Sequence, residues 1–115
     1  MIPKDDQKYL LDILDSARAI FQFAGKMNLE QFTENKMARR AVERELEIIG
    51  EATRNLSEEF RLAHKEIPWK AIIAQRNILA HDYGAVLVNK IHLVVINRIP
   101  ELIRLLEPFV RKEEP

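Results

Sequence analysis

The sequence predicts an all-α protein, an up-and-down bundle of four to five helices whose C-terminal helix is kinked. Apolar residues recur at intervals of three and four over long stretches, as they do on the buried face of a helix. Only 3 glycines occur among the 115 residues, and no segment alternates β-branched with polar residues between turn pairs. We therefore expect the helices to pack through their apolar faces into a single domain, residues 1–115.

The composition restricts the chemistry and the location of the protein. Because the chain has no cysteine, disulfides, a thiolate nucleophile and cysteine-ligated metal centres are excluded. His64 and His92 have no partner at ligand spacing, so we expect both to be ordinary surface or satisfied histidines. Neither a metal nor a cofactor is expected. The N-terminus shows no apolar signal core, and charges interrupt the most apolar stretch, so we expect a cytoplasmic protein without a membrane span. Since the formal net charge is zero, RNA would have to bind at a local basic patch.

Two helices are expected in the first half of the chain, besides a short helical turn at 29–32. The first runs from about Asp5 to Ala24, with Gly25 as its stop, and buries one stripe of residues: Leu10, Ile13, Leu14, Ala17, Ile20, Phe21 and Ala24. The second runs from about 35 to 56, and arginines alternating with glutamates opposite its apolar face indicate a solvated surface. Glu45 lies within the apolar arc, where we expect a structural ion pair.

The second half begins with Ser57 as the N-cap of a short helix, 58–64. Pro68 suits the first position of the next helix, Trp69 is expected to act as a packing anchor, and Gly84 is expected to end that helix. The last helix spans roughly 86–109, and Pro100 predicts a kink near 96–99 because proline has no N–H.

The last helix is apolar on more than one side, and two interpretations of this stay open. Its apolar residues are more than one bundle core requires: Leu87, Val88, Ile91, Leu93, Val94, Val95, Ile96, Ile99, Leu102, Ile103, Leu105 and Leu106. A homodimer would cover the excess surface. Alternatively, the helix is central and surrounded within the monomer.

The segment 75–84 concentrates polar chemistry at the end of one helix. Arg76 and Tyr83 are seven positions apart and would share a face of an ideal helix, as would Asn77 and His81 at four positions. Arg76 and His81 are separated by about 140° around the axis. Either the arginine wraps around the helix, or the helix loosens before Gly84, or a second chain completes the site.

These residue types suit cleavage of an RNA phosphodiester. Histidine titrates near neutrality and can take the 2′-hydroxyl proton or protonate the leaving 5′-oxygen. Arginine stays charged and grips phosphate oxygens in a fork. In a two-fold dimer, one His81 would act as base and its mate as acid. The same residues also fit a capped, solvated helix end with no catalysis, where a histidine near the C-terminus is favourable.

The motif Arg76-x4-His81-x-Tyr83 resembles the Arg-x4-6-His signature of HEPN ribonucleases and its longer form in HepT-like toxins. The flanking segments Ile48-Ile49-Gly50-Glu51-Ala52, Ile67-Pro68-Trp69 and Ile99-Pro100-Glu101-Leu102 are also similar to that family. The resemblance covers nearly the whole chain, and it implies a HEPN-like bundle of four or five helices.

The resemblance further implies a homodimeric, metal-independent endoribonuclease toxin of a type VII toxin–antitoxin pair. Arg76 and His81 would be catalytic. Tyr83 would accept AMP from a cognate nucleotidyltransferase antitoxin of the MntA type, which would neutralise the toxin. Asn77, Asp82 and Glu51 are supporting candidates: Asn77 could orient His81, and Glu51 faces away from the apolar arc but could reach a cleft between two chains. The alternative is a non-catalytic helical subunit that docks onto a nucleotidyltransferase.

Overall fold

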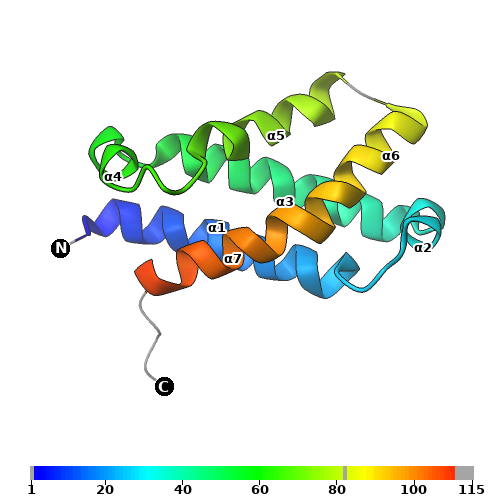
Figure 1. Ribbon diagram of the computed structural model, residues 1–115, viewed down its shortest axis with the longest axis horizontal. Coiled ribbons are helices and arrows are strands. Elements are labelled where there is room, and N and C mark those ends of the chain that lie inside the picture. Colours follow the sequence, from blue (N-terminus) through cyan, green and yellow to red (C-terminus); the bar gives the residue numbers. More distant parts are fainter. Residues whose placement is uncertain (1, 82, 111–115) are drawn as a thin grey trace.

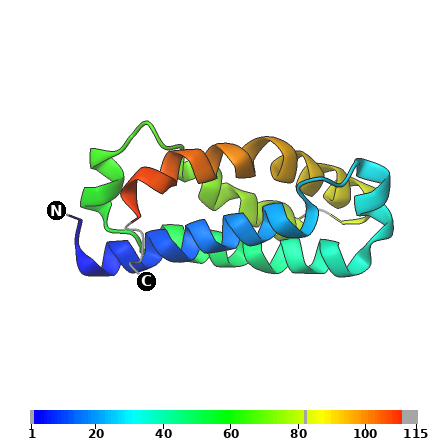
Figure 2. The ribbon, with the colours of Figure 1, turned by 90° about the horizontal axis from the view of Figure 1, so that it is seen from below.

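Four long helical segments run back and forth along one axis and form an up-and-down bundle (Figures 1 and 2). The computed structural model describes residues 2–81 and 83–110, and of His81 the backbone. The elements in chain order are α1 (Lys4–Ala24), α2 (Leu29–Glu34), α3 (Lys36–Asn55), α4 (Glu58–Ala63), α5 (Trp69–His81), α6 (Gly84–Leu93), a π-helical turn (Val94–Arg98), α7 (Ile99–Leu106) and a 3₁₀ turn (Glu107–Phe109). No strand occurs in the described part of the chain, so the predicted all-α fold is confirmed.

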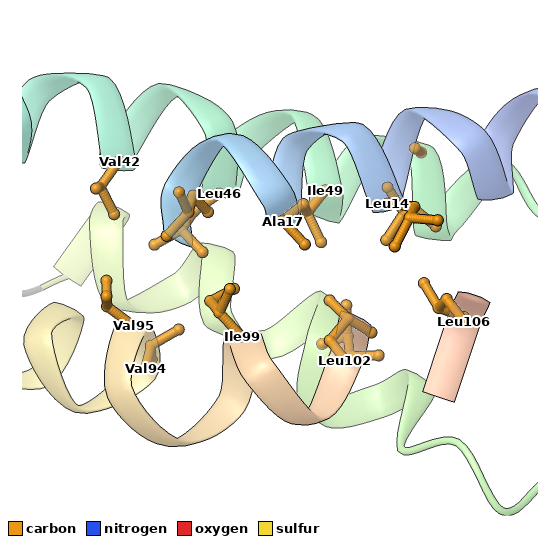
Figure 3. Packing of buried hydrophobic residues seen from close by; sticks show 14 of the residues in the cluster. Leu14, Ala17, Val42, Leu46, Ile49, Val94, Val95, Ile99, Leu102 and Leu106 are labelled. Atoms are coloured by element: carbon orange, nitrogen blue, oxygen red, sulfur yellow. The ribbon is translucent and has the colours of Figure 1, made fainter. Parts of the chain in front are cut away.

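The core lies where α1 and α3 face the C-terminal segment. Helix α3 packs between α1 and α5, and α7 packs back against α1. Figure 3 shows the buried side chains of α1 and α3 opposite those that follow α6: Leu14, Ala17, Val42, Leu46 and Ile49 face Val94, Val95, Ile99, Leu102 and Leu106. Burial of this apolar surface is the main force that holds the bundle together. None of the described helices is both long and apolar enough to cross a membrane.

The helix starts follow the capping signals in the sequence. The Asn35 side chain accepts from the Ala38 amide at 2.9 Å, and the Ser57 hydroxyl accepts from the Phe60 amide at 3.1 Å, so Ser57 is the predicted N-cap of α4. Helix α5 begins at Trp69, which places Pro68 one residue before the helix instead of at its first position. The predicted role of Trp69 as an anchor is confirmed, because the side chain is buried and its indole N–H donates to the carbonyl oxygens of Arg61 and His64.

The predicted end of α5 is wrong. The helix ends at His81, and Gly84 begins α6 with a φ of +63°. The residue between them in the described chain, Tyr83, has an extended backbone. Gly84 adopts its left-handed conformation without strain because it has no Cβ. A glycine after a helix therefore marks the start of the next helix here.

The predicted kink in the last helix is confirmed, and it takes the form of the π-helical turn Val94–Arg98. Pro100 has no N–H, so the carbonyl of Ile96 has no donor four residues later. Within the turn, the amide of Ile99 donates to the carbonyl of Val94, five residues earlier. One extra residue per turn lets the chain pass the proline while the hydrogen-bond ladder continues.

The two other histidines have structural surroundings, as predicted. His92 is buried, and its Nε2 lies 2.9 Å from the carbonyl oxygen of Met27. The half-buried ring of His64 packs between Phe60 and Phe109. Glu45 is half-buried, and no cation pairs with it among the described residues of one chain. The predicted ion pair, inside the cleft or at a dimer interface, stays a prediction.

A buried carboxylate ties the start of α1 to the start of α4. Asp6 is 2% exposed, and its two oxygens accept from the backbone N–H of Ser57 at 2.8 Å and from the Ser57 hydroxyl at 2.7 Å. The same hydroxyl caps α4. One side chain thereby holds the α3–α4 corner against α1.

Replacing this carboxylate should lower stability. In Asp6→Ala the two donors of Ser57 lose their acceptor, which should reduce the free energy of unfolding by about 1–3 kcal/mol in urea denaturation. Asp5→Ala is the matched control, because Asp5 is exposed in the same turn, and it should change stability little. Equal effects of the two substitutions would contradict the assigned clamp.

Candidate active site

Arg76 lies across α3 at the point where that helix has no side chain. A Cβ built on Gly50 would lie 3.5 Å from both Cβ and Cδ of Arg76. The arginine stem therefore lies over Gly50, where a Cβ would be at ordinary contact distance and a longer side chain would meet the stem. The sequence context of Gly50 gave no sign of this contact.

The guanidinium of Arg76 is held by Glu51, the residue after Gly50. Its Nη1 donates to Oε2 of Glu51 at 3.2 Å. The two side chains are 43% and 58% exposed, so the pair adds little to stability. The contact sets the direction in which the planar guanidinium of Arg76 points. Of its five N–H donors, only one is engaged by Glu51 in the described contacts. The structure therefore places Glu51 beside Arg76 within a single chain.

The other polar residues of the motif lie elsewhere on α5. Asn77 is exposed, and His81 follows it four residues later, on the same outer stripe of the helix. The His81 side chain and the whole of Asp82 lie outside the described residues. The backbone of α5 stays α-helical up to His81, and the guanidinium of Arg76 reaches toward α3.

Tyr83 presents its ring to solvent between α5 and α6. Its side chain is 81% exposed, and its backbone is extended, with a φ of −149° and a ψ of 172°. The prediction that Arg76 and Tyr83 share one helix face is wrong, because α5 ends two residues before Tyr83. What the structure gives Tyr83 is access from outside the molecule.

The surface has two hollows to consider, of which one borders residues of the predicted site and the other does not. One, of about 300 Å³, is bordered by Arg76 and Glu51 and extends over the outer face of α3 to α1. A larger one, of about 950 Å³, lies at the far end of α1 and α3, next to Phe21 and Asn35, and holds no predicted site residue. Within the described ranges, no three side chains of the types that ligate metals gather at one place.

A match to a known protein family shows to which family this chain belongs. The family described as ribonuclease HepT-like matches residues 13–109, which include α3, Arg76, His81 and Tyr83. The chain belongs to the HepT-like ribonuclease family. This membership confirms the predicted family, places the chain in the HEPN superfamily and identifies it as an endoribonuclease.

Relatives of this HepT-like chain come from archaea and bacteria. A Methanocaldococcus jannaschii protein, provisionally named as an RNase, is 35% identical over 99% of this chain and 94% of its own length. A Caldanaerobacter subterraneus protein with the same kind of name is 35% identical over 96% of this chain and 99% of its own. The Thermococcus cleftensis protein named "Probable ribonuclease HepT" is 36% identical over 86% of this chain and 90% of its own. No solved structure matches.

Two substitutions of Gly50 should separate stability from activity in this HepT-like ribonuclease. Gly50→Ala adds a methyl group at ordinary contact distance from Arg76 and raises helix propensity, so urea denaturation should show a gain of about 0.5–1 kcal/mol with RNA cleavage retained. Gly50→Leu should push the arginine stem off α3. If Arg76 has the catalytic role expected from the sequence, cleavage should then fall at least about tenfold, as for a misplaced catalytic group. Full cleavage activity in a folded Gly50→Leu variant would show that the position of Arg76 does not matter.

Proposed function

We propose that this HepT-like ribonuclease is the metal-independent RNA-cleaving toxin of a type VII toxin–antitoxin pair, active as a homodimer. Arg76 and His81 are its catalytic residues, and Tyr83 is the residue through which a nucleotidyltransferase antitoxin neutralises it. The observation that carries the proposal is the placement of Arg76, whose charged end is fixed by Glu51 yet remains half exposed at a surface hollow. A cation held in that way suits a phosphate ligand.

The proposed reaction is transesterification at an RNA phosphate. One His81 takes the proton of the 2′-hydroxyl, O2′ forms a bond to phosphorus, and the bond from phosphorus to the 5′-oxygen breaks as the second His81 protonates that oxygen. Arg76 stabilises the extra negative charge on the phosphorane oxygens. The products are a 2′,3′-cyclic phosphate and a 5′-hydroxyl end, so the step balances without an oxidant or reductant.

A second copy of the chain is proposed because, within one copy, Arg76 reaches toward α3 while position 81 belongs to the outer stripe of α5. Exposed apolar side chains support this proposal: Val86, Leu93 and Ile96 are 54%, 57% and 44% exposed along α6 and the π turn. Their spacing of seven and three residues puts them on one helical stripe. The outer stripe of α5 is lined by small exposed residues, Ala74 and Ala80, so a partner helix can approach Asn77 and His81 closely.

Mixed dimers test the shared site. In dimers purified with one wild-type and one His81→Ala chain, a cleft that uses both histidines loses its acid or its base, so cleavage of single-stranded RNA should fall more than about a hundredfold. Cleavage in wild-type dimers should persist in excess EDTA. Dimers that keep half of the wild-type rate would mean that each chain has its own site. No cleavage by the wild type, and no growth arrest on its expression, would favour the non-catalytic docking subunit.

Tyr83 is proposed as the AMP acceptor because its phenol is open to a partner enzyme. Its oxygen would attack the α-phosphate of ATP, the α–β phosphoanhydride bond would break, pyrophosphate would leave, and the phenol proton would pass to a base of the partner. The added phosphate and adenosine would then lie two residues from His81, where they would block RNA by charge and bulk.

Modification at Tyr83 can be followed by mass. After incubation with the proposed cognate nucleotidyltransferase and ATP, the wild type should gain the mass of one or more AMP units and lose RNA cleavage. Tyr83→Phe should gain no mass and should stay active. Tyr9→Phe serves as the control, because it removes the hydroxyl of the other tyrosine in the chain. An adduct that survives in Tyr83→Phe would refute the assignment.

A further inference from the structure

The hollow beside Arg76 is a groove that links the motif to the first helix of the chain. It has a volume of about 300 Å³, the lower end of the range for small-molecule sites. Helix α3 forms its floor, α1 one wall and α5 the other, with these residues at its surface: Tyr9, Asp12, Arg44, Glu47, Ile48, Glu51, Ala52, Asn55 and Arg76. We refer to this set as the α3 groove.

The α3 groove offers a flat aromatic side chain above an apolar floor. Tyr9 is half-buried on α1, and Ile48 and Ala52 of α3 lie in the floor. An unstacked nucleobase gains binding energy from an aromatic ring and from exclusion of water on an apolar surface, as single-stranded nucleic acids do on their binding proteins. The volume of the groove is large enough for one base.

The charges in the α3 groove are matched except at one place. Glu47 pairs with Arg44 at 3.5 Å, and Glu51 pairs with Arg76 at 3.2 Å. The carboxylate of Asp12 has no hydrogen bond or ion pair within the described part of the chain, although it is half-buried in the wall next to Tyr9. A carboxylate only accepts hydrogen bonds when ionised, so this position calls for a ligand with donors.

We propose that the α3 groove binds one guanine of the RNA substrate, next to the phosphate held by Arg76. Guanine presents two adjacent donors on its Watson–Crick edge, the N1–H and the N2 amino group, which match the two oxygens of a carboxylate. Adenine and cytosine present a single amino group beside an acceptor, which Asp12 would repel. The inference rests on the proposed function, because Arg76 borders the groove that would hold the base and would also bind the phosphate at the cleavage site.

The path of the RNA follows from this arrangement. Arg76 borders the groove on α5, and Asn77 and His81 lie on the outer stripe of the same helix. A guanine stacked on Tyr9 therefore places its own phosphate at the guanidinium and directs the chain toward α5. The α3 groove thus acts as a specificity subsite, and the chemistry remains with Arg76 and His81.

The binding test uses a chain that cannot cut its ligand. In the His81→Ala background, fluorescence anisotropy should compare a short labelled oligouridylate holding one guanosine with the same strand holding inosine, which lacks the N2 amino group, or adenosine. Guanosine should bind about tenfold more tightly than inosine, the effect expected for one charge-assisted hydrogen bond. Adding Asp12→Asn should abolish that preference, while Asp15→Asn, an exposed carboxylate on the same helix, should preserve it.

Variants of the ring complete the test. Tyr9→Phe keeps the aromatic face and should bind the guanosine strand like the parent. Tyr9→Leu keeps an apolar side chain without stacking and should bind about tenfold more weakly, with far-UV circular dichroism confirming that it is folded. Equal affinity for guanosine, inosine and adenosine in the parent, or an unchanged preference in Asp12→Asn, would overturn the guanine subsite.

Cleavage by the wild type is measured in parallel, so that the two proposals fail separately. Rapid cleavage that ignores the presence of guanosine would leave the nuclease proposal standing and remove the subsite. Binding that depends on guanosine and on Asp12, without any cleavage by the wild type, would keep the subsite and remove the nuclease proposal. Cleavage next to guanosine that Asp12→Asn redistributes to other bases would support both.

Discussion

The close contact of α5 with α3 at Gly50 determines how the motif residues are presented. Because Gly50 has no side chain, the stem of Arg76 lies directly on α3, and the next residue, Glu51, receives its guanidinium. The direction of the charge is thus set by backbone proximity and one ion pair. Since α5 is α-helical up to His81, the same contact directs Arg76 away from the stripe that carries Asn77 and position 81.

Helix α5 is held at both ends, while Ala74, Asn77 and Ala80 on its outer face are exposed. At its start, the indole of Trp69 is bound by two carbonyl groups of the α4 segment, and Asp6 ties that segment to α1. At its end, the extended Tyr83 and the left-handed Gly84 turn the chain into α6. A helix fixed in this manner can display polar groups to a second chain or a substrate without losing its position.

The sequence predicted the elements whose signals are local. Periodic apolar residues placed α1 and α3, and the N-cap Ser57 placed α4, to within about two residues, and Pro100 placed the irregular turn. The prediction that Gly84 ends α5 was wrong because a glycine can follow one helix or begin the next. The prediction that Arg76 and Tyr83 share a helix face failed for the same reason. The contact between Glu51 and Arg76 spans 25 positions, so only the packing of α3 on α5 reveals it.

The exposure of the Arg76–Glu51 pair explains how a residue can be both fixed and available. A fully buried ion pair would resist any competing anion, because breaking it would leave a charge without solvent. Here both side chains remain in contact with water, so the pair costs little to loosen, and the donors not used by Glu51 stay open to a phosphate. Under the proposed function, Glu51 would hold the guanidinium in place, and an incoming phosphate would bind the donors that Glu51 leaves unused.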